Sequence, residues 1–558
     1  MNAPAPLDPV FVQVTGPGSP FEIGERGGIR QFVNAPGDLD SMIESARRFG
    51  ERTCVVDFDS AGAERRLNFE QFFAWRDQLV PMLRAHRGER VAICMRNRSE
   101  WLVGFLAVMK AGGIAVLMNS RGSSAELLGM LEDTQPAVAL VDTERGRAIR
   151  EAGWTGRMLD LTRPFEAEEI SRRSTGPVEP HPDAVGDDPC AILFTSGTTG
   201  RSKGAVLSHR NMITGLMNTQ LSGMMVLHNM ARDMGIPVDH LIASLPQSAS
   251  LLVYPLFHVS GLLSAFLSPF LSGSKVVVMR RWDAQEAVRL IAREGISMFS
   301  AVPAMLWDLL HRARLNDVDI ASLRNIGCGG QALPVNLVAE VQALCPQAQI
   351  GTGYGMTECA GAIAQSVGPD FMRRPAAAGR VLPLVDVRIE DAEGRILPTG
   401  DVGEIVVRGA QIMLGYWNRP EDTAAAFADD GWLHTGDVGM VDEEGYVFIV
   451  DRKKDMIISG GENIYCAEVE RALGELPQVR ECAAIGIPDE RLGERLVAAV
   501  IADGLCEAEL IEWVAQRLAR YKAPTRIAFS TQPLPRNALD KVDKVALRKA
   551  WPTLIGEQ

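Results

Sequence analysis

The sequence lacks the features that mark several classes of protein. Its nine cysteines are spread singly through 558 residues, with no C-x-x-C pair and no Cys/His spacing suited to a metal. This pattern argues against a disulfide framework or a structural zinc, and it is typical of reduced thiols in the cytoplasm. Positive charge is also scarce, since 57 Lys and Arg stand against 70 Asp and Glu. A nucleic-acid-binding surface is therefore not expected, and any anionic substrate must be held by local positive sites.

The sequence also lacks a pattern typical of a targeting or membrane segment. The N-terminus shows no basic region followed by an apolar run, so we expect neither a signal peptide nor a transit peptide. Residues 1–28 are predicted to be a flexible lead-in. Only residues 251–273 are apolar enough to suggest a membrane span, but Pro255 and Pro269 interrupt them. A buried core segment is the better interpretation.

What the sequence does contain is a long alternation of helical and strand patterns. A chain of this length has room for about two to four structural units. Strands and helices alternate from about Ile29, as in a doubly wound sheet, and a second run of the same kind follows from about Ser274. Short strands with glycine turns over residues 381–415 predict a small β subdomain.

The expected fold class is therefore α/β. Residues 29–451 are predicted to form a large N-terminal domain of two α/β sheet subdomains plus the small β subdomain. Residues 457–558 are predicted to form a small α+β domain.

A loop rich in glycine and hydroxyl groups carries the strongest chemical signal. Residues 195–204, TSGTTGRSKG, hold five hydroxyl side chains, three glycines and two basic residues. Such a loop can point backbone N–H groups and hydroxyls at phosphate oxygens while Lys203 supplies a positive charge. A strand is predicted on either side of it, followed by a helix from Ser208 to about Gly215.

Two other kinds of loop share features with this one. A surface turn rich in Ser, Thr and Gly has a similar composition. A Walker A loop requires Ser or Thr directly after its lysine, but Gly204 follows Lys203, so that template fails.

Further blocks follow in order along the chain. Each has an ordinary interpretation when taken alone, such as a core histidine, a glycine-rich turn, a solvated surface acid or a basic turn. The blocks are PLFHVSG (255–261), GGQALP (329–334), YGMTE (354–358), TGD (435–437) with its flank from Gly415, DRKKDMIISGG (451–461) and PLPRNALDKVDK (533–544).

Together these seven blocks resemble the adenylate-forming superfamily, which includes acyl-CoA synthetases, adenylation domains of peptide synthetases and beetle luciferases. The resemblance implies that a carboxylic acid and MgATP give an acyl adenylate and pyrophosphate, and that CoA then displaces AMP. It also implies a mobile C-terminal domain that turns about a hinge at residues 452–456, with Lys454 at its centre.

The resemblance implies a role for individual residues at the nucleotide. Tyr354 would stack on adenine, Thr357 would meet the α-phosphate, Glu358 would bind the magnesium ion, and Asp437 would accept hydrogen bonds from the ribose. The residues implied in binding ATP or AMP are Thr195, Ser196, Gly197, Thr198, Thr199, Gly200, Lys203, Gly329, Gly330, Gln331, Tyr354, Gly355, Met356, Thr357, Asp437 and Arg452.

Catalysis and CoA binding are implied in the same way. The catalytic residues would be Lys541, Lys203, His258, Thr357 and Glu358, and Gly460 with Gly461 would contact CoA. The chain departs from the family at Asp540, where glycine is usual before the lysine. A carboxylate there would alter the field around Lys541.

The acid itself is the least determined part of the prediction. The pocket is expected around His258, Val302, Gly327, Gly353, Ala360 and Gly361, several of which are small and leave room for a sizeable apolar group. A medium- or long-chain fatty acid is the first choice, and an aryl or arylpropenoic acid is the alternative.

Other activities stay open at this point. They are a carrier-protein ligase, a luciferase-like enzyme, a phosphotransferase and a non-catalytic ATP-binding protein. The expected partners are the acid, ATP and CoA, with no nucleic acid and no integral membrane segment. Whether the chain forms a homodimer is left open.

Overall fold

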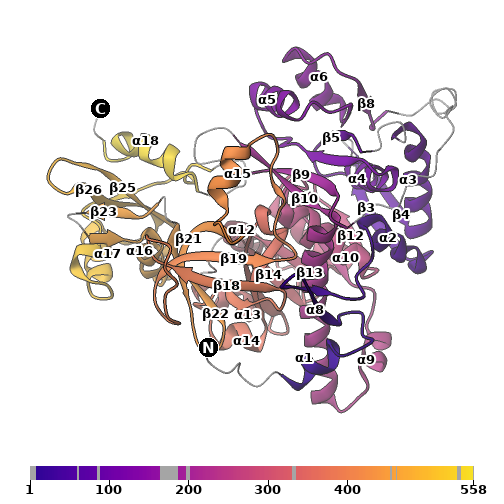
Figure 1. Cartoon of the computed structure of the whole chain (residues 1–558). Helices are drawn as coiled ribbons and strands as arrows, with labels where there is room; N and C mark the ends of the chain where they lie inside the picture. Colours follow the sequence, from indigo (N-terminus) through magenta and orange to yellow (C-terminus); the bar gives the residue numbers. More distant parts are fainter. Residues whose placement is uncertain are drawn as a thin grey trace.

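The computed structural model has the expected α/β architecture (Figure 1). It describes residues 8–59, 62–83, 88–163, 186–195, 202–329, 333, 335–452, 455–459, 462–536 and 542–556. Part of the stretch predicted as a flexible lead-in forms regular structure. It contains α1 (Pro9–Val14) and β1 (Ile23–Arg26), which pairs with β2 (Ile29–Phe32).

The first large sheet has seven strands and a parallel centre. Its inner strands are almost wholly apolar, as expected for strands covered on both faces. The order across the sheet is β20 (Gly415–Tyr416), β10 (Lys203–Ser208), β9 (Pro189–Thr195), β6 (Ile114–Leu117), β5 (Arg90–Cys94), β7 (Val138–Val141) and β8 (Met158–Asp160). Apolar side chains of α5 (Ser124–Thr134) and α6 (Thr143–Glu151) cover its outer face.

The second large sheet has thirteen strands. Its order is β18 (Val385–Glu390), β19 (Gly403–Gly409), β21 (Leu433–Val441), β22 (Tyr446–Arg452), β17 (Gly379–Val381), β16 (Gly361–Val367), β15 (Gln349–Met356), β14 (Asn325–Gly329), β13 (Met298–Ala301), β11 (Ala249–Leu252), β12 (Lys275–Val278), β3 (Thr53–Phe58) and β4 (Glu64–Asn68). From β3 to β15 the pairing is parallel. The strands of the predicted small β subdomain, β18 and β19, hydrogen-bond onto the antiparallel end of this same sheet.

Helices fill the space between the two sheets and cover the outer face of the second. Apolar side chains of the inner helices pack with strands of both sheets in one large core. The inner helices are α2 (Leu39–Glu44), the 3₁₀ segment η1 (Ser45–Phe49), α3 (Phe69–Leu83), α4 (Ser99–Ala111), α8 (His209–Met234), the π-helix η3 (Ser260–Leu267) and α10 (Ser268–Leu271). The outer helices are α11 (Ala284–Glu294), α12 (Pro303–Asn316) and α13 (Val335–Leu344).

The apolar segment 251–273 lies in this core, as predicted. Its η3 and α10 portions carry buried side chains such as Phe266 and Phe270. Within the described parts of the chain, no helix combines the length and the apolar content needed to cross a bilayer.

Helix α8 is longer than the sequence predicts. The expected end at about Gly215 is wrong, because the helix continues to Met234 and is followed by α9 (Val238–Ser244). Gly215 does not end the helix; it allows close packing instead. A Cβ at this position would lie 2.3 Å from the carbonyl oxygen of Ala360.

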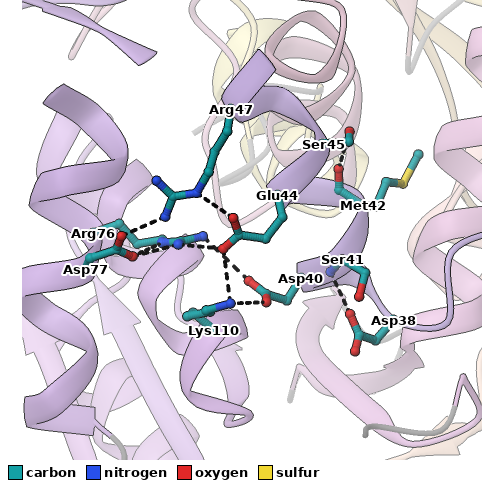
Figure 2. A network of polar contacts seen from close by, with 10 residues as sticks. All are labelled: Asp38, Asp40, Ser41, Met42, Glu44, Ser45, Arg47, Arg76, Asp77 and Lys110. Atoms are coloured by element: carbon teal, nitrogen blue, oxygen red, sulfur yellow. Dashed lines mark hydrogen bonds and ion pairs between the residues drawn. The ribbon is translucent and has the colours of Figure 1, made fainter. Parts of the chain in front are cut away.

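A network of charged groups ties α2, η1, α3 and α4 together (Figure 2). The side chain of Arg76 is fully buried, and its Nη2 lies 2.6 Å from both Glu44 Oε1 and Asp77 Oδ1. Lys110 Nζ lies 3.1 Å from Asp40 Oδ2 and from the same Glu44 oxygen. Although burial opposes it, hydrogen bonds from arginine neighbours hold the pKa of Glu44 at about 2.

The C-terminal elements form a separate small sheet, drawn in yellow and orange at the left of Figure 1. The strands are β24 (Glu462–Ile464), β23 (Ile457–Ser459), β26 (Gly493–Ala502), β25 (Val479–Asp489) and β27 (Ile527–Phe529). Helices α16 (Cys466–Gly474) and α17 (Glu507–Ala515) pack on one face, and α18 (Lys544–Leu554) packs on the other. The remaining short helical elements are α14 (Pro369–Arg373), α15 (Pro420–Ala426), η4 (Thr357–Cys359) and η5 (Arg520–Lys522).

Candidate active site

The carboxyl ends of parallel strands in the two large sheets meet near Asn97, which follows β5. Its Nδ2 donates to the Tyr254 carbonyl at 2.9 Å, and its Oδ1 accepts from Leu256 N at 3.1 Å. Tyr254 and Leu256 follow β11 of the second sheet, while Thr195 ends β9 of the first. Open α/β sheets bind ligands at such strand ends, so this junction is where a site is expected.

Two predicted nucleotide residues, Tyr354 and Arg452, both contact a third, Asp437, and the three come from separate blocks. The Tyr354 hydroxyl donates to Asp437 Oδ2 at 2.7 Å, and Arg452 Nε lies 3.4 Å from Asp437 Oδ1. Asp437 on β21 and Arg452 on β22 are direct cross-strand partners, which explains their contact. Burial, together with the nearby Asp437 charge, raises the pKa of Tyr354, so its phenol stays a hydrogen-bond donor.

Glu358 lies in η4, directly after the end of β15, and is only 6% exposed. Its Oε1 accepts a hydrogen bond from the Tyr416 hydroxyl at 2.9 Å. Burial raises the pKa of Glu358, and the Tyr416 hydrogen bond opposes that rise. The turn therefore holds a nearly enclosed carboxylate with a neutral donor on one of its oxygens.

Lys203 begins β10, opposite Thr195 at the end of β9. Its Nζ donates to Asp422 Oδ1 at 2.5 Å and lies 5.2 Å from the centroid of the Tyr416 ring. Asp422 belongs to α15. The predicted phosphate lysine thus has a carboxylate and an aromatic face as its neighbours.

Glycines from two predicted sets lie on paired strands: Gly329 is predicted near the base, whereas Gly327 and Gly353 are predicted around the acyl pocket. Gly327 pairs with Gly351, and Gly329 pairs with Gly353, across β14 and β15. Gly355 sits where β15 and β16 approach closely, since a Cβ there would lie 2.0 Å from the Gly361 carbonyl oxygen. Gly329 is the open position among these glycines, since a Cβ there would have no heavy atom within 4 Å.

The predicted acyl-pocket residues fall into two groups. His258 comes just before η3, with its ring centroid 4.3 Å from that of Phe257. Gly361 faces η3, because a Cβ at Gly361 would lie 3.9 Å from Leu263 Cδ1. Val302 is 3% exposed and packs into the other core, with α12 and α13.

Comparisons with known proteins match nearly the whole chain. The family model described as AMP-binding enzyme matches residues 42–417, and the model described as AMP-binding enzyme C-terminal domain matches residues 468–541. The chain belongs to the AMP-binding enzyme family.

Individual relatives agree with this assignment. The long-chain-fatty-acid–CoA ligase FadD13 of Mycobacterium tuberculosis is 32% identical over 88% of this chain and 94% of its own length. Feruloyl-CoA synthase of an Amycolatopsis species is 36% identical over 83% of this chain and 89% of its own. A solved structure of o-succinylbenzoate coenzyme A synthetase from Bacillus subtilis, in complex with ATP and magnesium ion, has 29% identity and a TM-score of 0.72. The match covers 91% of this chain and 99% of the chain in that structure.

These matches confirm the resemblance inferred from the motifs, and with it the expectation of an AMP-forming acid–thiol ligase of the acyl-CoA synthetase type. ATP and CoA are the substrates of such ligases, and a solved relative holds ATP with magnesium. The relatives differ in their acids, so the family assignment does not choose among fatty and aryl acids.

The roles of individual residues stay predictions. The part of the chain that the structure describes includes sixteen of the predicted site residues. They are Thr195, Lys203, His258, Val302, Gly327, Gly329, Gly353, Tyr354, Gly355, Met356, Thr357, Glu358, Ala360, Gly361, Asp437 and Arg452. The other predicted site residues lie outside the described residues. They are Ser196, Gly197, Thr198, Thr199, Gly200, Gly330, Gln331, Lys454, Gly460, Gly461 and Lys541.

The donor set around Glu358 suits magnesium that arrives with ATP. Within the described ranges, no group of three or more His, Cys, Asp or Glu side chains is arranged to hold a metal. Mg²⁺ commonly takes one or two carboxylates and completes its shell with phosphate oxygens and water. A single enclosed carboxylate therefore fits an ion that is held largely by the nucleotide.

Two residues in the site were missed by sequence reasoning. Tyr416 and Asp422 lie in the flank from Gly415 that supported the resemblance, but no role followed from their spacing. Their contacts with Glu358 and Lys203 depend on how β20 and α15 pack against distant parts of the chain.

Proposed function

We propose that this enzyme activates a medium- or long-chain fatty acid as its CoA thioester. The main support for a fatty acid is that the two helical segments packed against Ala360 and Gly361 carry no charged side chains. Neither α8 from Asn211 to Leu227 nor the segment 259–271 contains a charged residue. A substrate tail that carried a charge of its own, in addition to the reacting carboxylate, would have no oppositely charged group on these helices to pair with. Burying such an unpaired charge is costly, so an uncharged tail is favoured.

The length of α8 favours an extended tail over a compact ring. Gly215 is in contact with Ala360, and Met224 and Met225 lie further along the same helix, packed on the main core. Ten residues of α-helix rise about 15 Å. Methionine adapts its shape to flexible apolar groups, which suits a chain of variable conformation.

The proposed chemistry needs no covalent nucleophile on the protein. A carboxylate oxygen attacks the α-phosphorus of ATP, the bond to pyrophosphate breaks, and an acyl adenylate forms. The CoA sulfur then attacks the acyl carbon, the bond to AMP breaks, and the thiol proton passes to solvent. We assign Lys203 and Lys541 to the developing charge on the phosphates, because fixed cations in an enclosed site stabilise it strongly.

The nucleotide would lie against the contacts described above. Asp437 would accept hydrogen bonds from the ribose hydroxyls, since a carboxylate offers about four lone-pair sites. A magnesium ion at Glu358 would neutralise phosphate charge and orient the leaving pyrophosphate. Rotation of the C-terminal domain about Lys454 would then exchange Lys541 for Gly460 and Gly461 at the site.

A panel of acids tests the proposed substrate class. CoA-dependent AMP formation would be measured with saturated fatty acids from short to long chains, and with cinnamic and phenylacetic acids. We expect kcat/KM to rise about fourfold per methylene while the chain is being buried, since each contributes about 0.8 kcal/mol. Higher kcat/KM for the aryl acids would overturn the proposal in favour of the alternative that feruloyl-CoA synthase represents.

A variant with a larger side chain on η3 gives a second test. Leu263→Trp places extra volume beside Gly361 and should lower kcat/KM for long acids far more than for short acids. The short acid serves as the internal control for folding and for the nucleotide steps. An equal loss for all chain lengths would mean that the tail does not pass Leu263.

The arrangement of the cysteines favours a cytoplasmic location. All nine cysteines lie within the described residues, where none forms a disulfide and seven are buried. Reduced, unpaired cysteines are typical of a reducing compartment.

A further inference from the structure

Tyr416 occupies an unusual position between two predicted catalytic groups. The chain has only six tyrosines, and this one is placed on β20, directly beside the strand that leaves the predicted phosphate loop. Tyr416 pairs with Ala205 of β10, and Trp417 N donates to the Gly204 carbonyl at 2.8 Å. The backbone of Tyr416 is therefore fixed relative to Lys203, two positions before Ala205.

The same segment also holds the turn that carries Glu358. Met413 N donates to the Glu358 carbonyl at 2.8 Å, and the Tyr416 hydroxyl donates to Glu358 Oε1 at 2.9 Å. Residues 413–416 thus hydrogen-bond to both the backbone and the side chain of Glu358. Leu414 N, which lies between them, donates to the Val206 carbonyl of β10 at 2.9 Å.

The ring of Tyr416 faces Lys203, the positively charged one of the two predicted catalytic residues. Lys203 Nζ lies 5.2 Å from the ring centroid, within the range of a cation–π contact. The backbone N–H of Tyr416 donates to Thr423 Oγ1 at 2.9 Å, next to Asp422, which accepts from Lys203. Ring, hydroxyl and backbone of this one residue therefore each have a separate partner.

We propose that Tyr416 is a positioning residue for adenylation. Its hydroxyl holds the Glu358 carboxylate in the orientation that receives the divalent cation of MgATP, and its ring holds Lys203 beside the phosphate loop. The inference rests on the proposed roles of Glu358 and Lys203. It does not depend on which acid the enzyme uses.

The test separates the hydroxyl from the ring. Tyr416→Phe keeps the ring and its packing but removes the donor to Glu358, whereas Tyr416→Leu removes both. Binding of ATP would be measured by titration calorimetry with Mg²⁺, with Mn²⁺ and in EDTA, next to thermal melting. Loss of a group that orients a metal ligand typically costs about 10–100-fold in metal affinity.

The expected pattern is selective. Tyr416→Phe should weaken ATP binding about tenfold when Mg²⁺ or Mn²⁺ is present and leave binding in EDTA unchanged. Tyr416→Leu should weaken binding in EDTA as well, because Lys203 loses the aromatic face. Unchanged binding of MgATP by Tyr416→Phe, or an equal loss with and without metal, would overturn the proposal.

Tyr446→Phe is the matched control. Tyr446 also donates its hydroxyl to a carboxylate, that of Asp370, but it belongs to β22 and contacts none of the predicted site residues through that bond. Its loss should leave ATP binding with metal unchanged. An equal metal-selective loss in this control would show that the effect is not specific to Tyr416.

A second variant covers the case in which Tyr416→Phe does not fold. Thr423→Ala removes the acceptor of the Tyr416 backbone N–H and should give a smaller loss of the same kind, about threefold and selective for metal. Absence of that selectivity counts against the proposal. Because binding is measured without an acid, a wild-type protein that binds MgATP but forms no acyl-CoA would refute the proposed function and leave this test intact.

Discussion

The hydroxyl of Tyr354 donates to Asp437 Oδ2 at 2.7 Å, which joins two predicted nucleotide residues 83 positions apart. Both side chains are only 8% exposed. The contact orients the carboxylate through the hydroxyl alone, and stacking on adenine is the role predicted for the ring of the same tyrosine. Adenine and ribose would thus meet two groups that are already held together before ATP binds.

Tyr354→Phe isolates this contact. The ring is kept, but Asp437 loses a buried donor, and hydrogen bonds to charged groups are worth about 1.5–3 kcal/mol. We expect KM for ATP in the adenylation step to rise about tenfold, with a smaller change in kcat. The ATP dependence of pyrophosphate release checks this, and a KM equal to that of the wild type would show that the hydroxyl does not prepare the site.

Lys541→Ala separates the two half-reactions. If Lys541 acts on the phosphates, adenylation should fall by about 10²–10³-fold, the usual cost of removing one preorganised charge-stabilising group. Thioester formation from supplied acyl adenylate and CoA should persist. Lys549→Ala, an exposed lysine of α18, is the control, and equal loss of both half-reactions would remove Lys541 from its assigned role.

Arg76→Met should destabilise the N-terminal region strongly. The substitution removes a fully buried guanidinium from Glu44 and Asp77, which keep only Arg47 and Lys110 as cationic neighbours. Breaking a buried ion pair in this way costs about 3–5 kcal/mol. The matched control is Arg314→Met, because Arg314 is half exposed and pairs with Glu340 at 2.6 Å on the surface. Surface pairs contribute about 0–1 kcal/mol, so comparable losses of thermal stability in both variants would contradict the prediction.

Asp451→Asn should change how stability depends on pH. Burial raises the pKa of Asp451 to about 6 from 3.8, against the opposing charge of Lys544. The folded protein therefore binds this proton more tightly than the unfolded chain. The free energy of unfolding of the wild type then falls as pH rises between about 4 and 6, by up to about 3 kcal/mol from this group.

The asparagine variant cannot ionise and escapes that loss. Its melting temperature should match the wild type near pH 4 and exceed it near pH 7.5. Asp429→Asn, at an exposed position, is measured alongside it. A difference between Asp451→Asn and wild type that does not change with pH would exclude the assigned titration.

Much of the fold and of the site follows from local sequence. Alternating apolar strands and amphipathic helices indicated an α/β chain, because periodicity reports which faces are buried. The glycine-rich loop indicated a phosphate site from its composition. The YGMTE block and the TGD turn indicated nucleotide chemistry through their resemblance to the adenylate-forming superfamily. Each of these motifs is contiguous in the chain and can be identified without knowing which distant residues it contacts. The motifs were therefore enough to identify the family.

Local signals failed where a residue serves a distant partner. Gly215 looks like a helix end, since glycine commonly follows the last turn. In the fold it lets α8 pass close to Ala360, a contact visible only after β16 and α8 have packed. Likewise, β3 is an ordinary strand by sequence, and only tertiary pairing places it beside β12 in the second sheet.

The sequence alone thus determined the reaction class and the identity of most groups expected at the nucleotide. Tertiary structure decided which of them touch. Lys203 meets Asp422 across 219 positions, and Tyr416 reaches Glu358 because β20 pairs with β10. Spacing along a chain cannot encode such contacts, since they depend on strand register and on the packing of elements that form far apart in the sequence.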